Sequence, residues 1–148
     1  MTDESPGGAR VGGSHRAILW TDGASRGNPG PAGIGALLKT ESGDVLLAES
    51  AYLGEATNSV AEYKALLLGL ERALELGVRS IEVRADSELL VKQLKGQYQV
   101  RSAGLQPLYR SACALLARFE SSALVHVRRE HNMEADRLAN AGIDSRPR

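Results

Sequence analysis

Three apolar runs in the first third of the chain constrain the fold more than any other feature. They cover residues 17–21, 34–39 and 45–49, and a polar turn at residues 41–44 separates the last two. Short apolar runs bounded by turn residues are typical of β-strands. Strands that follow one another through short turns lie antiparallel. The first third of the chain therefore predicts an antiparallel three-stranded sheet.

The apolar spacing then changes to that of a helix. Between Tyr63 and Val78 the leucines recur at helical spacing, and Asn58 and Ser59 precede them as candidate N-cap residues. Antiparallel strands followed by strand–helix–strand crossovers indicate an α/β fold, with a mixed sheet and helices on its faces. The rest of the chain predicts a strand at 81–85, a helix at 88–95, a helix at 105–119, a strand at 124–127 and a helix from about 132 to 141.

Composition and charge are those of a single globular domain. The 148 residues are about one domain's length, and 18 basic residues balance 18 acidic ones. One cysteine allows no disulfide within the chain, and no apolar run approaches the roughly 18 residues of a membrane span. We expect residues 1–14, rich in glycine, to form a flexible tail and residues 15–148 to form one domain. We expect a cytoplasmic monomer that binds no membrane.

Four acidic residues stand out by their positions. Asp22 follows the first apolar run and Asp86 follows the strand at 81–85. If these two strands are neighbours, both carboxylates lie at one edge of the sheet, where α/β proteins bind ligands. Glu62 leans toward the sheet, where a carboxylate without a partner is costly. Asp136 lies on the face of the last helix that also carries its small and apolar residues.

These carboxylates also have a plainer interpretation. Asp22 and Asp86 suit turns and helix N-caps, and Glu62 stands at capping-box spacing from Asn58 or Ser59. Carboxylates that converge without histidine or cysteine ligands suit a hard divalent cation, Mg²⁺ or Mn²⁺. Two such ions can activate water and stabilise the leaving oxygen of a phosphodiester. The residues alone leave both interpretations open.

Four segments carry these carboxylates. They are DGASRGNPG within residues 21–33, TNSVAE at 57–62, RADS at 84–87 and NMEADRLAN at 132–140. In this order they resemble the motifs of the ribonuclease H type 1 family. The resemblance implies a ribonuclease H-like α/β fold, in which a five-stranded mixed sheet of order 3-2-1-4-5 is flanked by helices. It also implies an endonuclease that hydrolyses the RNA strand of RNA–DNA hybrids and leaves 3′-hydroxyl and 5′-phosphate ends.

The resemblance assigns roles by position. It implies that Asp22, Glu62, Asp86 and Asp136 are the catalytic residues and bind two Mg²⁺ ions, or Mn²⁺, with Asp22 bridging both. Asp136 is implied at the ion that orients the attacking water, and Glu62 and Asp86 at the ion facing the leaving oxygen. Groups that donate and accept hydrogen bonds can read the RNA 2′-hydroxyl. The implied substrate-binding residues are Gly23, Ser25, Arg26, Gly27, Asn28, Asn58, Ser59 and Asn132.

The chain departs from the best-studied bacterial members of the family at three places. Those members insert a helix and a basic loop before the long helix of the second half, where this chain has only residues 97–104. Glu88 stands where they have a glutamine that contacts RNA. His131 lies closer to the final motif than their catalytic-loop histidine, so the chain resembles a compact branch of the family. We consider His131, with Arg128 nearby, both as an auxiliary proton shuttle or product-release residue and as an ordinary loop residue.

Basic residues in the second half offer another way to hold the substrate. From Leu89 to Phe119 every charged residue is basic, which predicts a phosphate track if these residues share a face and solvated helix charge if they do not. Tyr98 is a stacking residue or a cap on the core, and we expect Trp20 and Cys113 to be buried. The basic residues of this stretch are Lys92, Lys95, Arg101, Arg110 and Arg118, with Arg26, Arg128 and Arg129 outside it.

Two other functions fit the same sequence. A non-catalytic module could bind hybrids or duplexes on this scaffold, although four carboxylates facing phosphates would weaken that binding. A transposase-like or exonuclease core of the same superfamily would cut DNA duplexes as readily as hybrids. The resemblance favours hybrid-specific hydrolysis, with an RNA–DNA hybrid as the binding partner.

Overall fold

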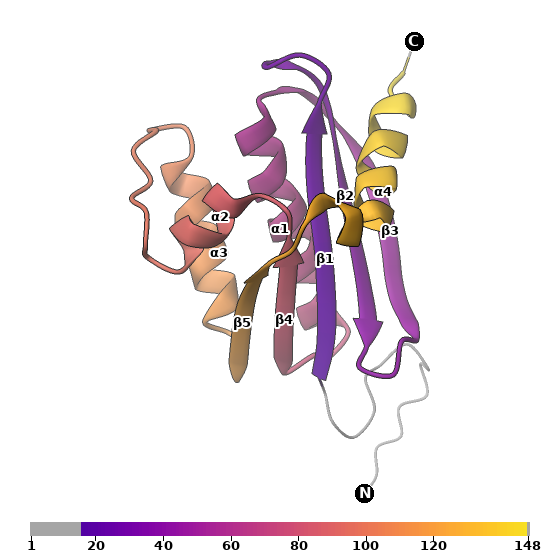
Figure 1. Ribbon diagram of the computed structural model, residues 1–148, viewed down its shortest axis with the longest axis vertical. Coiled ribbons are helices and arrows are strands. Elements are labelled where there is room, and N and C mark those ends of the chain that lie inside the picture. The colour runs from indigo at the N-terminus through magenta and orange to yellow at the C-terminus, as the bar shows by residue number, and fades with distance from the viewer. Residues whose placement is uncertain (1–15, 148) are drawn as a thin grey trace, which may run out of the picture.

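The computed structural model describes residues 16–147, so the tail expected at residues 1–14 lies outside the described part of the chain. Strands and helices follow one another in the predicted order (Figure 1). The short 3₁₀ turn η1 is an addition that the sequence patterns do not predict. The elements are β1 Arg16–Ser25, β2 Gly30–Thr40, β3 Val45–Ala56, α1 Asn58–Glu75, β4 Ser80–Ala85, α2 Glu88–Leu94, α3 Gln106–Leu116, β5 Ser121–His126, η1 Arg129–His131 and α4 Met133–Asp144.

The strands form one mixed sheet. β1 pairs antiparallel with β2, and β2 with β3, whereas β4 pairs parallel with both β1 and β5. The strand order is β3-β2-β1-β4-β5, which confirms the predicted order 3-2-1-4-5. Because β1 and β4 run in the same direction, residues near their carboxyl ends meet at one edge of the sheet.

The first three strands are longer than predicted. β1 continues through Asp22 to Ser25, so Asp22 lies inside the strand and does not end it. Glycines conceal this extension, because they interrupt the apolar pattern where helices touch the sheet. A Cβ at Gly33 would lie 2.2 Å from the carbonyl oxygen of Ala139, and one at Gly35 would lie 2.6 Å from that of Ala135. α4 therefore packs on strand backbone that has no side chains in the way.

Some elements of the second half also end at different residues. α3 ends at Leu116 and β5 begins at Ser121, each three residues earlier than predicted. α4 continues to Asp144 because Gly142 packs closely on β3, where a Cβ would lie 2.3 Å from the carbonyl oxygen of Ala51. Among the helices within residues 16–147, none combines the length and the apolar character needed to cross a membrane.

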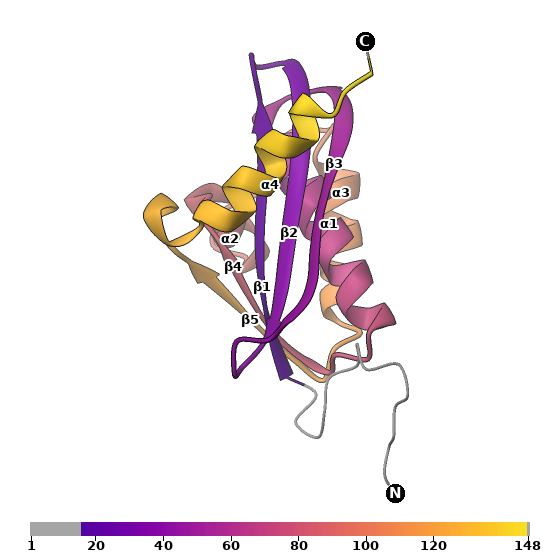
Figure 2. The same ribbon diagram turned by 90° about the vertical axis from the view of Figure 1, so that its right-hand side faces the viewer.

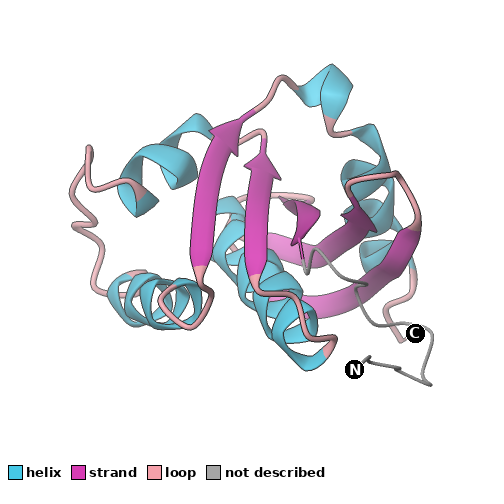
Figure 3. Ribbon diagram, turned by 90° about the horizontal axis from the view of Figure 1, so that it is seen from below, coloured by secondary structure: helices cyan, strands magenta, loops and turns pink. Residues whose placement is uncertain are grey.

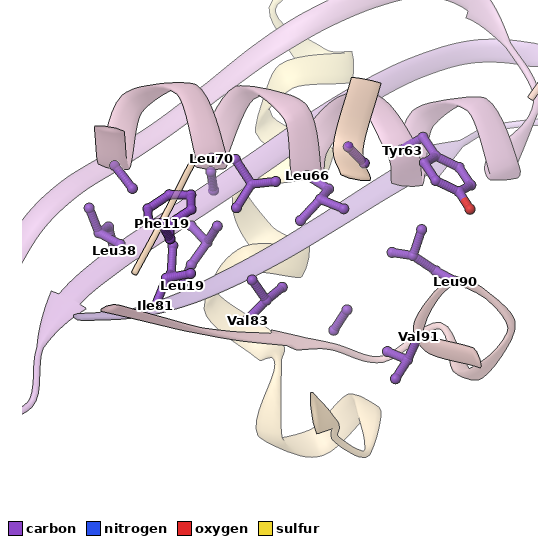
Figure 4. Close-up of a cluster of buried hydrophobic side chains, with 14 of the residues drawn as sticks. Leu19, Leu38, Tyr63, Leu66, Leu70, Ile81, Val83, Leu90, Val91 and Phe119 are labelled. Atoms are coloured by element: carbon purple, nitrogen blue, oxygen red, sulfur yellow. The ribbon is translucent and has the colours of Figure 1, made fainter. Parts of the chain in front are cut away.

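Helices cover both faces of the sheet. α1 packs on β1 and β2, with α3 against α1, and α4 packs on β1, β2 and β3 from the other face. Figure 2 shows α1 and α3 on one side of the strands and α4 on the other, and Figure 3 shows the same layers from below. The main core lies between α1, α3 and the sheet. Figure 4 shows Leu66 and Leu70 of α1 facing Leu19, Ile81 and Val83 of the strands. This core fixes α1 against β1 and β4.

Trp20 and Cys113 are not the buried residues that the sequence predicts. Trp20 is half-buried, because strand alternation turns it away from Leu19 and the main core. Its ring lies between two cations, with Lys39 Nζ at 5.5 Å and Arg84 Cζ at 5.2 Å from the ring centroid. Cys113 is also partly exposed. An aromatic ring flanked by cations is stable at a surface, so Trp20 needs no complete burial.

Candidate active site

Three carboxylates from separate elements converge at the edge of the sheet where β4 ends. Asp22 lies in β1, Glu62 in α1, and Asp86 directly after β4. One oxygen of each lies within 4.8 Å of the oxygens of the other two. The parallel register explains part of this, because Thr21 pairs with Ala85 and the next residue in each strand is an aspartate. The structure thus brings together three of the four carboxylates singled out from the sequence.

Glu62 reaches the group because α1 lies unusually close to β1. A Cβ at Gly23 would lie 2.2 Å from the carbonyl carbon of Ala61 and 2.4 Å from the nitrogen of Glu62. The backbone N–H of Gly23 donates a hydrogen bond to Glu62. Only a residue without a side chain permits this contact. Gly23 therefore positions a carboxylate, in addition to its predicted role at the substrate.

The capping-box interpretation of Glu62 is wrong. The N-cap of α1 is Thr57, whose Oγ1 accepts a hydrogen bond from the backbone nitrogen of Val60 at 3.2 Å. A capping box counted from Thr57 would require its acidic residue at position 60. Glu62 stands two residues further along the helix, where its side chain faces the other carboxylates.

Asp136 approaches from α4, on the opposite face of the sheet. Its carboxyl group lies close enough to Asp22 to help to raise the pKa of Asp22. It is not one of the three carboxylates that lie within 4.8 Å of one another among residues 16–147. The structure therefore places the fourth predicted carboxylate beside Asp22, at the margin of the group.

Burial and mutual repulsion favour protonation of this group. Asp22 is 5% exposed, and its pKa is raised to about 9, mainly by burial and then by the charges of Glu62 and Asp86. The pKa of Glu62 is raised to about 8 by burial and by the charge of Asp86. The Gly23 N–H and the positive charge of Arg129 act in the opposite direction on Glu62. Its Oε1 is buried and has no hydrogen-bond partner within residues 16–147.

These features fit a divalent cation. The donors are carboxylate oxygens, which suit a hard cation such as Mg²⁺ or Mn²⁺. A cation there would give Glu62 Oε1 the partner that it lacks, and its charge would lower the raised pKa values of Asp22 and Glu62. Asp22, Glu62 and Asp86 can therefore hold such an ion, with Asp136 adjacent to it.

Comparisons with known proteins agree with this arrangement. A model of the reverse transcriptase-like family matches residues 20–142. The crystal structure of RNase H1 from the archaeon Halobacterium salinarum is similar with a TM-score of 0.86 and 40% identity, covering 88% of this chain and 99% of that one. This chain belongs to the ribonuclease H type 1 family.

Further ribonuclease H relatives match most of the chain. LC11-RNase H1, isolated from compost, was solved in complex with an RNA/DNA hybrid. It is 43% identical with a TM-score of 0.82, covering 86% of this chain and 96% of that one. The bifunctional protein Rv2228c of Mycobacterium tuberculosis is 44% identical over 131 residues, which are 88% of this chain. The present chain spans 36% of the length of that relative.

Hydrogen bonds join the β1–β2 loop to the start of α1. Asn58 Oδ1 accepts a hydrogen bond from the Ser25 backbone nitrogen at 3.0 Å, and the Asn58 backbone nitrogen donates to Asn28 Oδ1 at 3.0 Å. The Ser25 hydroxyl donates to the carbonyl oxygen of Ala56 at 2.8 Å and also contacts that of Gly27. These bonds join four of the eight predicted substrate-binding residues, namely Ser25, Gly27, Asn28 and Asn58.

Two predicted substrate-binding residues have other partners. Arg26 pairs with Asp144 at 2.6 Å and donates to Asn140 Oδ1 at 3.2 Å, so its side chain is directed to the end of α4. Asn132 is 2% exposed and hydrogen-bonds within the protein. Ser59, in contrast, lines a small pocket together with Glu62.

The loop before α4 carries the auxiliary candidates Arg128 and His131. Arg128 and His131 are exposed, and His131 lines an open cavity of about 230 Å³ together with Trp20 and Asn132. Arg129, which the sequence suggested only as part of a phosphate track, lies close enough to Glu62 to lower its pKa. Its position in the Arg128–His131 run, directly before the last motif, is the sequence signal for this proximity.

The region between α2 and α3 lacks the inserted helix, as the sequence predicts. No helix is inserted between Leu94 and Gln106. Lys92 pairs with Glu88 at 3.2 Å, and its Nζ lies 5.0 Å from the centroid of the Tyr98 ring. Tyr98 is 53% exposed, so it does not cap the core. Its ring and the neighbouring cation are available to a ligand at this surface.

The raised pKa values predict that the metal-free protein loses stability as pH rises. The unfolded chain releases the Asp22 proton near pH 3.8, whereas the folded protein holds it to about pH 9. The bound proton therefore stabilises the folded protein fully below about pH 4, and this effect is lost by about pH 9. Between these values the free energy of unfolding falls by about 1.4 kcal/mol per pH unit for one proton. Glu62 contributes in the same direction up to about pH 8.

Urea unfolding in EDTA, at steps from about pH 5 to pH 9, measures this slope. We expect Asp22→Asn to flatten it. Mg²⁺ should stabilise the protein most at high pH, because the ligands must be deprotonated. A slope that is the same in both proteins contradicts the assignment of the proton to Asp22.

Proposed function

We propose that this chain hydrolyses the RNA strand of RNA–DNA hybrids. The convergence of Asp22, Glu62 and Asp86, with oxygens within 4.8 Å of one another, carries this proposal. The relative LC11-RNase H1, which was solved with a bound RNA/DNA hybrid, supports the substrate class. A module that only binds nucleic acid would gain nothing from a buried acidic group facing phosphates.

We assign two Mg²⁺ ions to the four carboxylates. Asp22 interacts with Asp136 as well as with Glu62 and Asp86, which suits it to serve both ions. Asp136 then belongs to the ion on the side of the attacking water, and Glu62 and Asp86 to the ion on the side of the leaving oxygen. Bound there, the ions would supply an activated water and stabilise the charge on the leaving oxygen.

The hydrolysis consumes one water. The water oxygen bonds to phosphorus, and the bond between phosphorus and the 3′-oxygen breaks. The leaving oxygen takes up a proton to become a 3′-hydroxyl, while the other fragment keeps a 5′-phosphate. The chain's own contribution is to hold its carboxylates in register around the reacting phosphate, on elements fixed by the main core.

We assign recognition of the RNA strand to the surface formed by the β1–β2 loop and the start of α1. Ser25, Asn28 and Asn58 fix one another's positions through backbone and side-chain hydrogen bonds. A rigid surface of donors and acceptors can distinguish a strand with 2′-hydroxyls from one without them. Lys92 and the exposed ring of Tyr98 would contact the nucleic acid through charge and stacking.

Cleavage of three labelled duplexes tests the substrate class. The purified protein is incubated with an RNA–DNA hybrid, an RNA duplex and a DNA duplex of one sequence, each with Mg²⁺, Mn²⁺ or EDTA. We expect cutting of the RNA strand in the hybrid, with either metal and not with EDTA. Equal cutting of the DNA duplex would indicate a transposase-like or exonuclease core instead. Tight hybrid binding without cutting would indicate a binding module.

A further inference from the structure

Asn132 occupies the N-cap position of α4 but does not cap the helix. Asparagine is a preferred N-cap residue because its side-chain oxygen can accept from the first helix amides. The Asn132 side chain makes no such bond. It is 2% exposed and turned toward the sheet. A requirement other than capping therefore determines where this side chain lies.

The Asn132 side chain instead connects β1 to Asp86. Its Nδ2 donates one hydrogen bond to the carbonyl oxygen of Thr21 at 3.0 Å and another to Asp86 Oδ2 at 3.1 Å. These two bonds use both hydrogens of the amide nitrogen. Asn132 Oδ1 is buried without a partner within residues 16–147. Because an unpaired buried oxygen is costly, the benefit of this residue must come from its nitrogen.

We propose that Asn132 is a positioning residue that holds the Asp86 carboxylate for metal binding. This proposal rests on the proposed function and deepens it. Asp86 follows the last residue of β4, so strand pairing does not fix its side chain. The bond to Asn132 fixes the carboxylate relative to Thr21, the residue directly before Asp22. One side chain thereby sets the separation between two of the three converging carboxylates.

An asparagine suits this place for reasons of charge. Burial, and then the negative groups around them, already raise the pKa values of Asp22 and Glu62. An aspartate at position 132 could not donate to Asp86 while ionised, and it would add to this repulsion. The amide supplies two donors without adding charge. α4 packs on β2, whereas Asp86 follows β4, on the opposite side of β1. Asn132 therefore links the position of α4 to the position of the Asp86 carboxylate.

Mg²⁺ binding and catalysis in Asn132→Ala and Asn132→Asp test this role. Mg²⁺ alone is titrated into the hybrid-free protein and followed through the backbone amide signals of Asp22 and Gly23 in NMR spectra. Loss of a hydrogen bond that orients a metal ligand lowers metal affinity or activity about 10- to 100-fold. We expect such a loss in Mg²⁺ affinity and in kcat for Asn132→Ala, with the KM for hybrid within about 3-fold of the parent. Asn132→Asp should lose more Mg²⁺ affinity and more kcat than Asn132→Ala.

The matched control is Ile143→Val, which removes a methyl group from the fully buried inner face of α4. It should lower the Tm and leave Mg²⁺ affinity unchanged. Asn132→Ser, which keeps a small donor, replaces the alanine variant if that variant does not fold. Parent-level Mg²⁺ affinity in folded Asn132→Ala or Asn132→Asp, or a loss confined to KM, would overturn the proposal. The titration requires no cleavage, so a protein that binds Mg²⁺ but cuts nothing contradicts the proposed function alone.

Discussion

Replacing Asp22 with asparagine is expected to lower the rate of hybrid cleavage by about 1,000-fold or more, because the bound metal then stabilises the transition state by several kcal/mol less. Asp22 interacts with each of the other three carboxylates, so no neighbouring group can replace it. Hybrid binding should persist or strengthen, because one negative charge facing the phosphates disappears. Single-turnover cleavage and fluorescence anisotropy with labelled hybrid measure the two effects separately.

The same variant should be more stable than the parent in EDTA at pH values near 8. The buried Asp22 carboxyl is ionised there only at a cost, as its raised pKa indicates. Asparagine has nearly the same shape and carries no charge. Glu71→Gln, which removes one negative charge from the exposed face of α1, is the matched control and should change neither cleavage nor stability appreciably. Cleavage at the parent rate by Asp22→Asn would contradict the mechanism.

Adding a single methyl group at Gly23 is expected to damage both the fold and the site. The new Cβ would lie 2.2 Å from the carbonyl carbon of Ala61, so α1 must move away from β1. Overpacking against backbone should cost roughly 3 kcal/mol or more of unfolding free energy. The movement carries Glu62 with it, so Mg²⁺ affinity and cleavage should fall further than the loss of folded protein explains. Urea unfolding and Mg²⁺ titration of the folded fraction measure these effects.

Gly104→Ala provides the control for Gly23→Ala. Gly104 lies in the loop before α3, where an added Cβ meets only the Ser102 hydroxyl, at 3.8 Å. The substitution should be neutral or stabilise the protein by about 0.4–1 kcal/mol through the unfolded chain. Full activity in Gly23→Ala, with Glu62 still binding Mg²⁺, would show that α1 need not lie this close to β1.

Apolar spacing and turn residues predicted the succession of elements and the antiparallel pairing of the first three strands, whereas the order of the strands in the sheet came from the resemblance to the ribonuclease H family. Apolar spacing failed at the ends of β1, β2 and β3, and in β1 and β2 glycines stand in the parts that were missed. At Gly23, Gly33 and Gly35 the deciding contact is with helix backbone, and the strand's own pattern contains no sign of that partner. The same limit applies to Trp20, whose cations come from β2 and β4.

The convergence of Asp22 and Asp86 was predictable, because a parallel pair of strands places residues after matching positions side by side. The contribution of Asn132 was not predictable from the sequence. The match to the last motif suggested substrate contact, whereas the structure shows a buried side chain that donates hydrogen bonds to Thr21 and Asp86. The partners of Arg26 were hidden for a similar reason, because Asp144 lies 118 positions away along the chain. Contacts that depend on the docking of α4 cannot be read from local spacing.

The ends of the cut RNA strand test the central claim most directly. The wild-type protein is incubated with hybrid in Mg²⁺, and the RNA fragments are resolved beside standards with known termini. Attack by water, assisted by cations at Asp22, Glu62, Asp86 and Asp136, predicts 3′-hydroxyl and 5′-phosphate ends and no product in EDTA. Fragments with 2′,3′-cyclic phosphate ends would show attack by the RNA's own 2′-hydroxyl, and cutting that persists in EDTA would show that no divalent cation is needed. Either result would contradict the account.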